Sequence, residues 1–373
     1  MIKKEKNLIL FILMFSLSFV AVGRSKKSDI KLVIEKVNSH WQNQNPDPGN
    51  AFWHNAAYHT GNMEAYFITK NETFRLYSEK WASRNNWMGA QGQDKSKWQY
   101  KYGERPEFVM FGDWQICFQT YIDLYHLAPD SIKISRAIEV MEYQMSLPNV
   151  NYWWWVDGLY MVMPVMTKMY KLTGRRIYLD KLYEYYRYSE SLMKDPETGF
   201  FYRDAKYLYP KHKTLNGIKD FWSRGNGWLY AGLIKVLQDM PKDYKYRDVF
   251  VNQYIRMTNE LLKIQQPEGY WTRSLLEPTQ APGYETSGTA FFTYGLLWGV
   301  NNRYLKGARY KTAAMRAWNY LSTVALQADG SIGYVQPIGE KAILTEKLSP
   351  LSIENFGVGA FLLAASEMYR FVK

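Results

Sequence analysis

The clearest candidate for chemistry in this chain is Asp157, which follows three consecutive tryptophans (residues 153–155) and Val156. A carboxylate at the edge of an aromatic, poorly hydrated pocket has its charged form disfavoured, so its pKa rises toward the range useful for a proton donor. Asp is also a preferred helix N-cap, and an apolar run follows at once. A cap explains the acid but not its aromatic neighbours, and both roles are compatible. Asp157 is therefore predicted to act as a general acid.

A second candidate is Arg224, which lies in the run FWSRGNGW at residues 221–228. Arginine makes planar two-point contacts with a carboxylate or a sulfate, and the neighbouring glycines let the backbone come close to a ligand. A helix start with a purely structural arginine is the alternative. The run predicts a substrate-binding group made of Arg224, Trp222, Asn226 and Trp228.

The composition favours an anionic sugar as the partner. Aromatic residues make up 17% of the chain, with 14 Trp and 31 Tyr, and such rings offer an apolar face and a polar rim to sugar rings. The formal charge of +12 suggests that the partner is anionic. Nucleic acid would also be anionic and stacking, but the Lys and Arg residues are spread along the whole chain and no nucleic-acid motif is recognised.

The first 23 residues predict a secretory signal. Lys3, Lys4 and Lys6 precede an apolar run at residues 8–22, and Ala21-Val22-Gly23 forms a small-x-small cleavage site. We expect the protein to be exported, to the periplasm or the medium, and to be soluble after cleavage; an uncleaved N-terminal anchor is the alternative. The single cysteine, Cys117, lies in an apolar run and is expected to be a small buried hydrophobe.

The rest of the chain repeats one helical unit. An introductory helix at residues 29–44 ends at Pro46 and Pro48. Each unit then has a helix that is apolar or small nearly all round, a turn, and an amphipathic helix. The first kind must be buried and the second must cover it. The sequence therefore predicts an all-α closed toroid of six helix pairs, as a single domain over residues 24–373, with the introductory helix as the sixth outer helix. Inner helices are expected at 52–68, 111–127, 156–172, 223–240, 285–304 and 355–369, outer helices at 72–85, 131–145, 178–193, 247–264 and 310–326, and short strand pieces near 199–202 and 269–272.

Polar residues recur where each inner helix begins. The inner helices of a closed ring run in one direction, so their starts converge on one mouth, where unpaired N–H groups also favour an anion. This convergence adds His54, Asn55, Glu285 and Ser287 to the predicted substrate-binding residues. A lone histidine in a helix is more often structural, and this alternative stays open for His54 and His59. The residues at these starts are His54, Asn55, Asp113, Gln115, Asp157, Arg224, Asn226, Glu285, Ser287, Glu354 and Asn355.

Two motifs together, WVDGLYM at residues 155–161 and RGNGW at residues 224–228, resemble glycoside hydrolase family 105, the unsaturated rhamnogalacturonyl and glucuronyl hydrolases. The resemblance implies an (α/α)6 barrel that removes a 4,5-unsaturated uronic acid from the non-reducing end of oligosaccharides made by polysaccharide lyases. It implies hydration of the enol ether: an acid protonates C4, water adds at C5, and the hemiketal opens and expels the aglycone. In this resemblance Asp157 matches the acid/base, Asp113 the second carboxylate, and Arg224 the arginine facing the substrate, with Trp155 beside the acid.

The chain departs from this family at one position. Family members carry a histidine near the place where this chain has residues 201–204, whereas the nearest histidine here is His212. His212 is either a substrate contact or a loop residue in a basic cluster. No group of His, Cys, Asp and Glu has a metal-ligand spacing, so we expect neither a metal nor a cofactor.

The leading hypothesis is a secreted hydrolase of unsaturated uronyl oligosaccharides, with the glucuronyl type favoured. The basic residues around one loop favour a sulfated, rhamnose-linked glycan such as ulvan, and unsaturated galacturonyl hydrolysis of rhamnogalacturonan is the next hypothesis. An inverting glycosidase, a uronan lyase and a non-catalytic sugar-binding toroid are also compatible with these residues. The loop residues are Arg203, Lys211, His212, Lys213 and Lys219.

Overall fold

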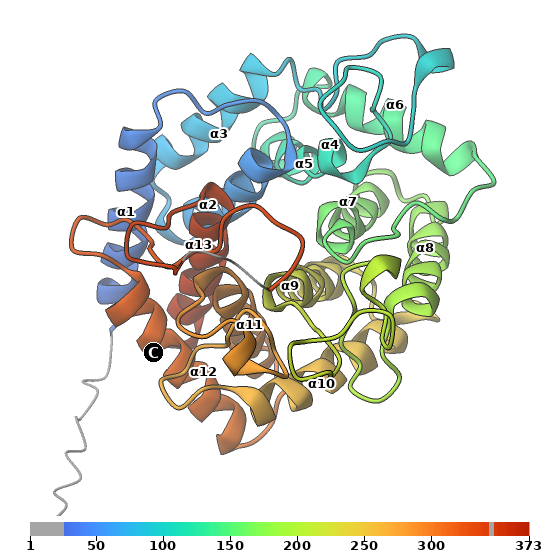
Figure 1. Cartoon of the computed structure of the whole chain (residues 1–373). Coiled ribbons are helices and arrows are strands. Elements are labelled where there is room, and N and C mark those ends of the chain that lie inside the picture. Colours follow the sequence, from blue (N-terminus) through green and yellow to red (C-terminus); the bar gives the residue numbers. More distant parts are fainter. Residues whose placement is uncertain (1–25, 343–346, 373) are drawn as a thin grey trace, which may run out of the picture.

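The computed structural model describes residues 26–342 and 347–372, so the predicted signal peptide lies outside the described residues. Within those ranges the main elements are two concentric rings of helices and no strand occurs, which confirms the all-α toroid (Figure 1). The inner ring contains α2 (Trp53–Thr69), α4 (Gly112–Gln115) followed by α5 (Cys117–Leu127), α7 (Gly158–Thr173), α9 (Ser223–Asp239), α11 (Thr286–Asn301) and α13 (Asn355–Phe371). The outer ring contains α1 (Lys27–Gln44), α3 (Glu72–Arg84), α6 (Ile132–Ser146), α8 (Ile177–Met193), α10 (Arg247–Ile264) and α12 (Ala308–Tyr320).

The inner helices are buried nearly all round, as their composition predicts. Every residue of α9 from position 223 to 237 is buried, whereas α10 buries only one face. Neighbouring inner helices pack against one another, α13 packs against α2, and α1 lies against both, as predicted. The chain therefore closes as an (α/α)6 barrel, with Cys117 fully buried in its wall.

Ring closure depends on two facing glycines. A Cβ atom added to Gly61 of α2 would lie 2.2 Å from the carbonyl oxygen of Gly359, and a Cβ added to Gly359 of α13 would lie 2.6 Å from that of Ala57. The two backbones are in direct contact, which only residues without a side chain permit. The first and last inner helices are thus held together where the ring would otherwise open.

Some predicted boundaries differ from the structure. The fifth inner helix ends at Asn301 rather than near residue 304, because Arg303 has a left-handed backbone (φ 64°) and Asn302 caps the carbonyl of Trp298. The second inner helix is interrupted at Ile116, and α12 continues into a π-helical turn, η4 (Leu321–Ala325). At the predicted strand pieces, residues 199–202 form only an isolated bridge, Lys194 with Phe201, and residues 269–272 form none.

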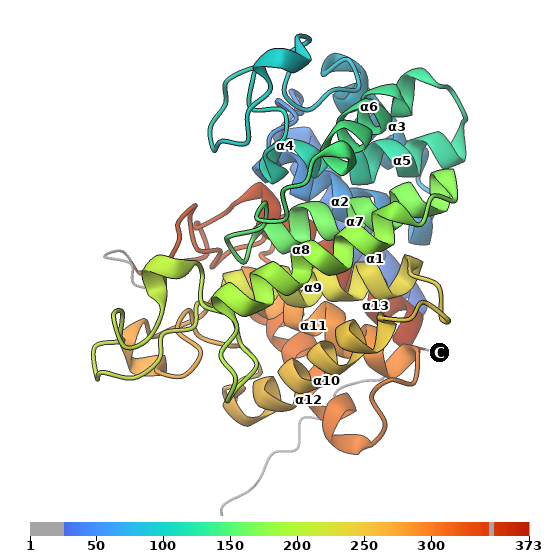
Figure 2. The ribbon, with the colours of Figure 1, turned by 90° about the vertical axis from the view of Figure 1, so that its right-hand side faces the viewer.

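The two ends of the barrel differ in the length of their connections. Inner helices lead to outer helices through short turns, whereas the return connections are long, as between α8 and α9 or between α12 and α13. Figure 2 shows these long loops projecting on one side, the side on which the inner helices begin. Three of the described loops carry short 3-10 turns, η1 (Lys95–Lys97), η2 (Ala205–Tyr207) and η3 (Pro278–Gln280). The long loops can therefore build a site over the helix starts.

Replacing Gly61 with alanine is expected to lower the free energy of unfolding by about 2 kcal/mol, within the range of overpacking costs. The control is Gly232→Ala in α9, where the nearest atoms lie 3.1 Å from an added Cβ. In that variant the better helix propensity of alanine, about 1 kcal/mol, offsets most of the crowding. Thermal denaturation of both variants checks this ranking, and equal melting temperatures would contradict the account of ring closure.

Candidate active site

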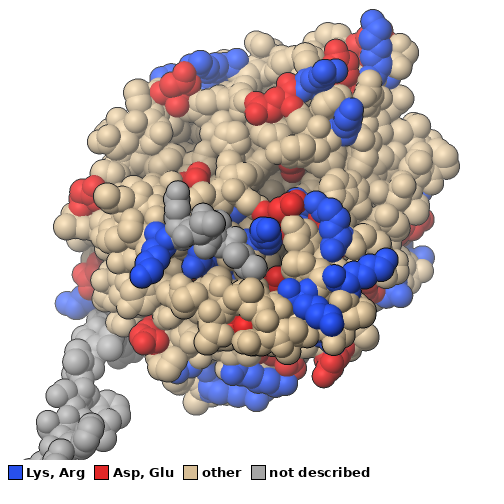
Figure 3. Space-filling view, viewed as in Figure 1, with Lys and Arg blue, Asp and Glu red and all other residues tan. Residues whose placement is uncertain are grey.

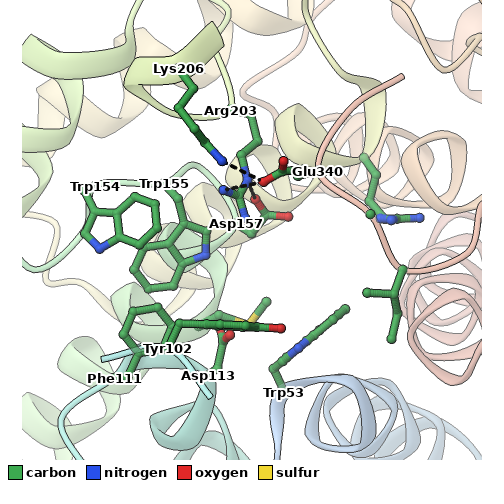
Figure 4. Close-up of a pocket in the computed structure, with 14 residues that line it drawn as sticks. Trp53, Tyr102, Phe111, Asp113, Trp154, Trp155, Asp157, Arg203, Lys206 and Glu340 are labelled. Carbon is green, nitrogen blue, oxygen red and sulfur yellow. Dashed lines mark hydrogen bonds and ion pairs between the residues drawn. The ribbon is translucent and has the colours of Figure 1, made fainter. Parts of the chain in front are cut away.

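A cavity of about 380 Å³ opens at the end of the barrel where the inner helices begin. Figure 3 shows it as a hollow with acidic atoms inside and Lys and Arg side chains along one side of its rim. Four predicted site residues line it, namely Arg224 and the labelled Asp113, Asp157 and Trp155 of Figure 4. The predicted convergence of helix starts on one mouth therefore holds for the two acids and the arginine. The remaining lining residues are Trp53, Tyr102, Phe111, Trp154, Met161, Arg203, Lys206, Ile338, Gly339 and Glu340.

The two acids are set by the packing of Trp155. A Cβ atom at Gly158, next to Asp157, would lie 2.8 Å from the Trp155 ring. A Cβ at Gly112, next to Asp113, would lie 3.3 Å from the same ring. One indole thus contacts the backbone beside each acid, and glycine at both positions makes these contacts possible. Stacking on Phe111, at 4.5 Å between ring centroids and 7° between planes, fixes the indole in turn.

Asp157 occupies the N-cap position of α7, but its side chain makes no capping hydrogen bond. Its Oδ2 atom is buried and has no hydrogen-bond partner among the described residues. Burial raises the pKa of Asp157, while the positive charges of Arg203 and Arg224 partly oppose this shift. A raised pKa, with an oxygen that accepts no hydrogen bond from the described residues, suits a group that donates a proton. The cap explanation accounts for the position of Asp157 alone.

Asp113 is more strongly affected. It lies in the first turn of α4 and its side chain is buried. Burial raises the pKa of Asp113 well above its usual range, and the nearby charge of Asp157 raises it further, against a smaller effect of Arg203. Two neighbouring acids share this cavity, so the ionisation of one disfavours the ionisation of the other.

Arg224 is a buried cation at the cavity wall, with only 1% of its surface exposed. Its guanidinium lies between the rings of Trp222 and Phe356, at 4.6 and 4.8 Å from their centroids. It donates to the carbonyl oxygens of Gln336 and Pro337, the second at 2.8 Å. Burial lowers the pKa of Arg224 to about 10, so it remains positively charged at neutral pH.

Arg203 reaches the cavity from the loop for which the resemblance implied a histidine. Its Nε lies 3.5 Å from Oδ2 of Asp157, and its Nη1 donates to Asp204 at 2.6 Å. The sequence drew attention to Arg203 only as part of a basic cluster, and it missed Lys206 and Glu340 as site residues. The histidine that the resemblance implied near residues 201–204 was the signal that could have drawn attention to this loop.

The other members of the FWSRGNGW run support the site from behind. Asn226 exchanges two hydrogen bonds with the backbone of Phe201, each 2.9 Å, and so fixes the loop that presents Arg203. Trp222 stacks on Arg224 and donates to Oε1 of Gln336 at 2.8 Å. Trp228 is core, packed on Phe291 at 4.4 Å between centroids. None of these three lines the cavity, because the helix turns their side chains into the barrel wall.

The remaining predicted contacts also lie away from the cavity. Glu285 caps α11 by accepting from the N–H groups of Ser287 and Gly288, and both Glu285 and Ser287 are fully buried. Asn55 bonds to Asn50 and accepts from Asn355 at 2.9 Å. The three histidines considered as substrate contacts have other partners. His54 packs edge-on to Trp53, and His59 is buried against Trp81. His212 pairs with Asp220 at 2.8 Å.

A helical toroid with paired carboxylates and aromatic walls around its mouth is the architecture of a sugar-processing enzyme. The model of Glycosyl Hydrolase Family 88 matches residues 27–372, and the chain belongs to this family of glycoside hydrolases. A relative in Formosa agariphila, named unsaturated 3S-rhamnoglycuronyl hydrolase, is 32% identical over 331 residues, which is 85% of this chain and 84% of the relative.

Solved structures of high identity share the fold. A protein described as a polysaccharide lyase is 58% identical, with a TM-score of 0.91, and the match covers 93% of this chain and 98% of the other. A Glycosyl hydrolase family 88 protein from Bacteroides vulgatus is 54% identical, with the same TM-score and coverage of 93% and 100%. At 20% identity, a possible member of family 105 from Salmonella enterica, with a TM-score of 0.75 and coverage of 97% and 99%, shows that the fold extends to that family.

We predict that Asp113→Asn raises the melting temperature at neutral pH. The folded-state pKa of Asp113 is raised, so its stabilising contribution is present below the unfolded pKa, near 4, and is lost as the pH rises through the folded pKa. Removing the charge removes that loss, and the gain should disappear in acid. Melting curves across pH, measured by circular dichroism, test this.

The matched control is Asp195→Asn, for which the opposite sign is expected. Burial raises the pKa of Asp195, but hydrogen bonds from Lys219 and Thr198 outweigh it and lower the pKa overall. The Asp195 carboxylate therefore stabilises the fold above the unfolded pKa, and Asp195→Asn should lower the melting temperature at neutral pH. A lower melting temperature for Asp113→Asn as well would show that the cavity does not disfavour its charge.

Proposed function

We propose that this glycoside hydrolase removes a 4,5-unsaturated uronic acid from the non-reducing end of lyase-generated oligosaccharides, as members of family 105 are expected to do. The observation that carries the proposal is the pair Asp157 and Asp113 in one aromatic cavity. Asp157 has a raised pKa and a buried oxygen that accepts no hydrogen bond from the described residues. Asp113 lies close enough that the charge of Asp157 raises the pKa of Asp113. This arrangement suits a group that donates a proton to the substrate.

In the proposed reaction, the carboxylic acid of Asp157 gives its proton to C4, and the π electrons of the C4=C5 bond form the new C–H bond. Positive charge develops at C5 and is shared with the ring oxygen. Water then adds at C5 and returns a proton to the carboxylate of Asp157. The hemiketal opens to a ketone at C5, and the hemiacetal at C1 expels the aglycone alcohol and leaves an aldehyde. One water is consumed and Asp157 is regenerated.

The other cavity residues have roles that follow from their chemistry. Arg224 is a fixed buried cation, which suits the carboxylate that every uronate carries at C5. Trp154 and Trp53, which are partly exposed at the cavity, offer aromatic surface to the sugar, whereas the buried Trp155 positions the two acids. Asp113 helps to keep a proton on the acid pair, because two neighbouring carboxylates resist joint ionisation.

For the substrate, we propose an unsaturated glucuronate linked to rhamnose, with sulfation on the rhamnose. The name of the Formosa agariphila relative, an unsaturated 3S-rhamnoglycuronyl hydrolase, supports this choice. Cationic side chains beyond Arg224 at the cavity, Arg203 and Lys206, also support an anionic substrate. We further propose that the protein is exported to meet such a substrate, as its N-terminal residues predict. Unsaturated galacturonyl oligosaccharides of rhamnogalacturonan are the comparison substrates.

A uronan lyase is the second candidate, because a 58% identical protein is described as a polysaccharide lyase. The two reactions have opposite effects on the same double bond. A lyase creates the C4=C5 enol ether by elimination, whereas the proposed hydrolase consumes it by hydration. The ultraviolet absorbance of this conjugated bond therefore changes with opposite sign.

The test is to add the protein to intact acidic polysaccharides and, separately, to oligosaccharides already cut by lyases. The proposal predicts falling absorbance with the oligosaccharides and no change with the polymers. Rising absorbance with a polymer would establish a lyase. Cleavage of saturated sugars without absorbance change would indicate an ordinary glycosidase, and ligand binding without any cleavage would leave a sugar-binding toroid.

Asp157→Asn is expected to lower kcat by about 10²–10⁴-fold, which is the usual contribution of a general acid–base group, while the fold is retained. Asparagine keeps the shape of the side chain but has no acidic proton to deliver. Asp130→Asn, in the exposed turn before α6, serves as the control and should retain full activity. Absorbance assays with circular dichroism spectra of both variants decide this, and near-normal turnover by Asp157→Asn would remove the assigned role.

A further inference from the structure

At the outer edge of the cavity, two cationic side chains converge on one carboxylate. Nζ of Lys206 lies 3.0 Å from Oε2 of Glu340, and Nη1 of Arg203 lies 3.5 Å from the same oxygen. The three residues come from two loops that are distant in the sequence, residues 203–206 and residue 340, and all three line the cavity (Figure 4). A carboxylate of the protein thus occupies a place where two positive charges meet.

The three members of this group are held to different degrees. Arg203 is fixed, because its Nη1 also bonds to Asp204, whose side chain is only 3% exposed. Lys206 and Glu340 have side chains that are 62% and 45% exposed. An ion pair between such exposed groups contributes little to stability, so Glu340 can leave at small cost when another anion arrives. Arg203 would remain in place, since it is anchored by Asp204 without Glu340, and Lys206 would stay near it because its Nζ also lies 3.8 Å from Asp204.

The proposed hydration reaction does not need this second cationic pair. Arg224 already supplies a buried cation for the carboxylate of the unsaturated uronate, and it forms no ion pair with a carboxylate among the described residues. Arg203 and Lys206, in contrast, are already matched by an acidic group at the open end of the cavity. A second anion on the substrate, on the sugar that follows the uronate, would meet them there.

We propose that Arg203 and Lys206 form a second anion subsite, for a sulfate ester or carboxylate on the sugar next to the unsaturated uronate, with Glu340 as its occupant in the free protein. This inference rests on the proposed function. A neutral neighbouring sugar cannot replace the Glu340 carboxylate as the partner of Arg203 and Lys206, so its binding is not strengthened by these two cations. A charged one forms charge-assisted hydrogen bonds and releases Glu340 to water. The subsite would thereby select among lyase products that share the same unsaturated end.

The test compares kcat/KM for an unsaturated glucuronyl–rhamnose disaccharide with and without sulfate on the rhamnose, and for an unsaturated uronate followed by a second uronate. The measured quantity is the ratio of kcat/KM on each charged substrate to that on the neutral one. Lys206→Met should lower this ratio about tenfold for the anion that the subsite takes, as expected for one charge-assisted hydrogen bond. Glu340→Gln should raise the ratio, because it removes the competing carboxylate. Raising the salt concentration should reduce the preference of the wild-type protein.

Lys211→Met is the matched control, since Lys211 is exposed on the same loop but does not line the cavity. It should leave every ratio unchanged. Unchanged ratios in both Lys206→Met and Glu340→Gln would overturn the subsite, as would an equal loss on neutral and charged substrates. If Lys206→Met does not fold, Glu340→Gln decides alone. A wild-type protein that consumes none of the three substrates would instead contradict the proposed function.

Discussion

The packing of Trp155 against two glycines is the contact on which the site depends. The indole fills the space beside Gly112 and Gly158, and each glycine is the chain neighbour of one acid. A larger residue at either position would move a helix start and with it Asp113 or Asp157. Burial is also the main reason that the pKa values of both acids rise. The positions of the two acids therefore depend on one aromatic contact.

The barrel and its long loops contribute differently to the cavity. The inner helices supply the acids and Arg224 at fixed positions, because the ring is closed and its helices are buried on all sides. The loops supply the charged rim, and the FWSRGNGW run connects the two: Asn226 fixes the backbone of Phe201, and Trp222 fixes Gln336. Through these bonds one helix start holds both the loop that carries Arg203 and the loop that leads to Glu340.

Sequence patterns predicted the ring well because burial on all sides and amphipathicity follow directly from residue order. They also placed Asp113, Asp157, Arg224 and Trp155 together, since helix starts converge in a closed ring. They did not determine which way each helix start is rotated, so Glu285 and Trp228 were expected at the mouth but lie in the wall. Tyr102, Lys206 and Glu340 come from long loops without periodicity, and their approach to the cavity depends on tertiary contacts that sequence spacing does not encode. The departure from the resemblance near residues 201–204 was informative, because Arg203 lines the cavity in that region.

The central claim is that Asp157 delivers a proton to C4 of an enol ether, and it is tested most directly by following turnover in D2O with proton NMR. The account predicts that the vinyl signal of H4 disappears at the same rate as the aglycone is released. It also predicts that the earliest product carries a single deuterium at C4, before slower solvent exchange. Release of the aglycone while the H4 vinyl signal persists on the freed uronate would show direct cleavage at the glycosidic carbon and contradict the account.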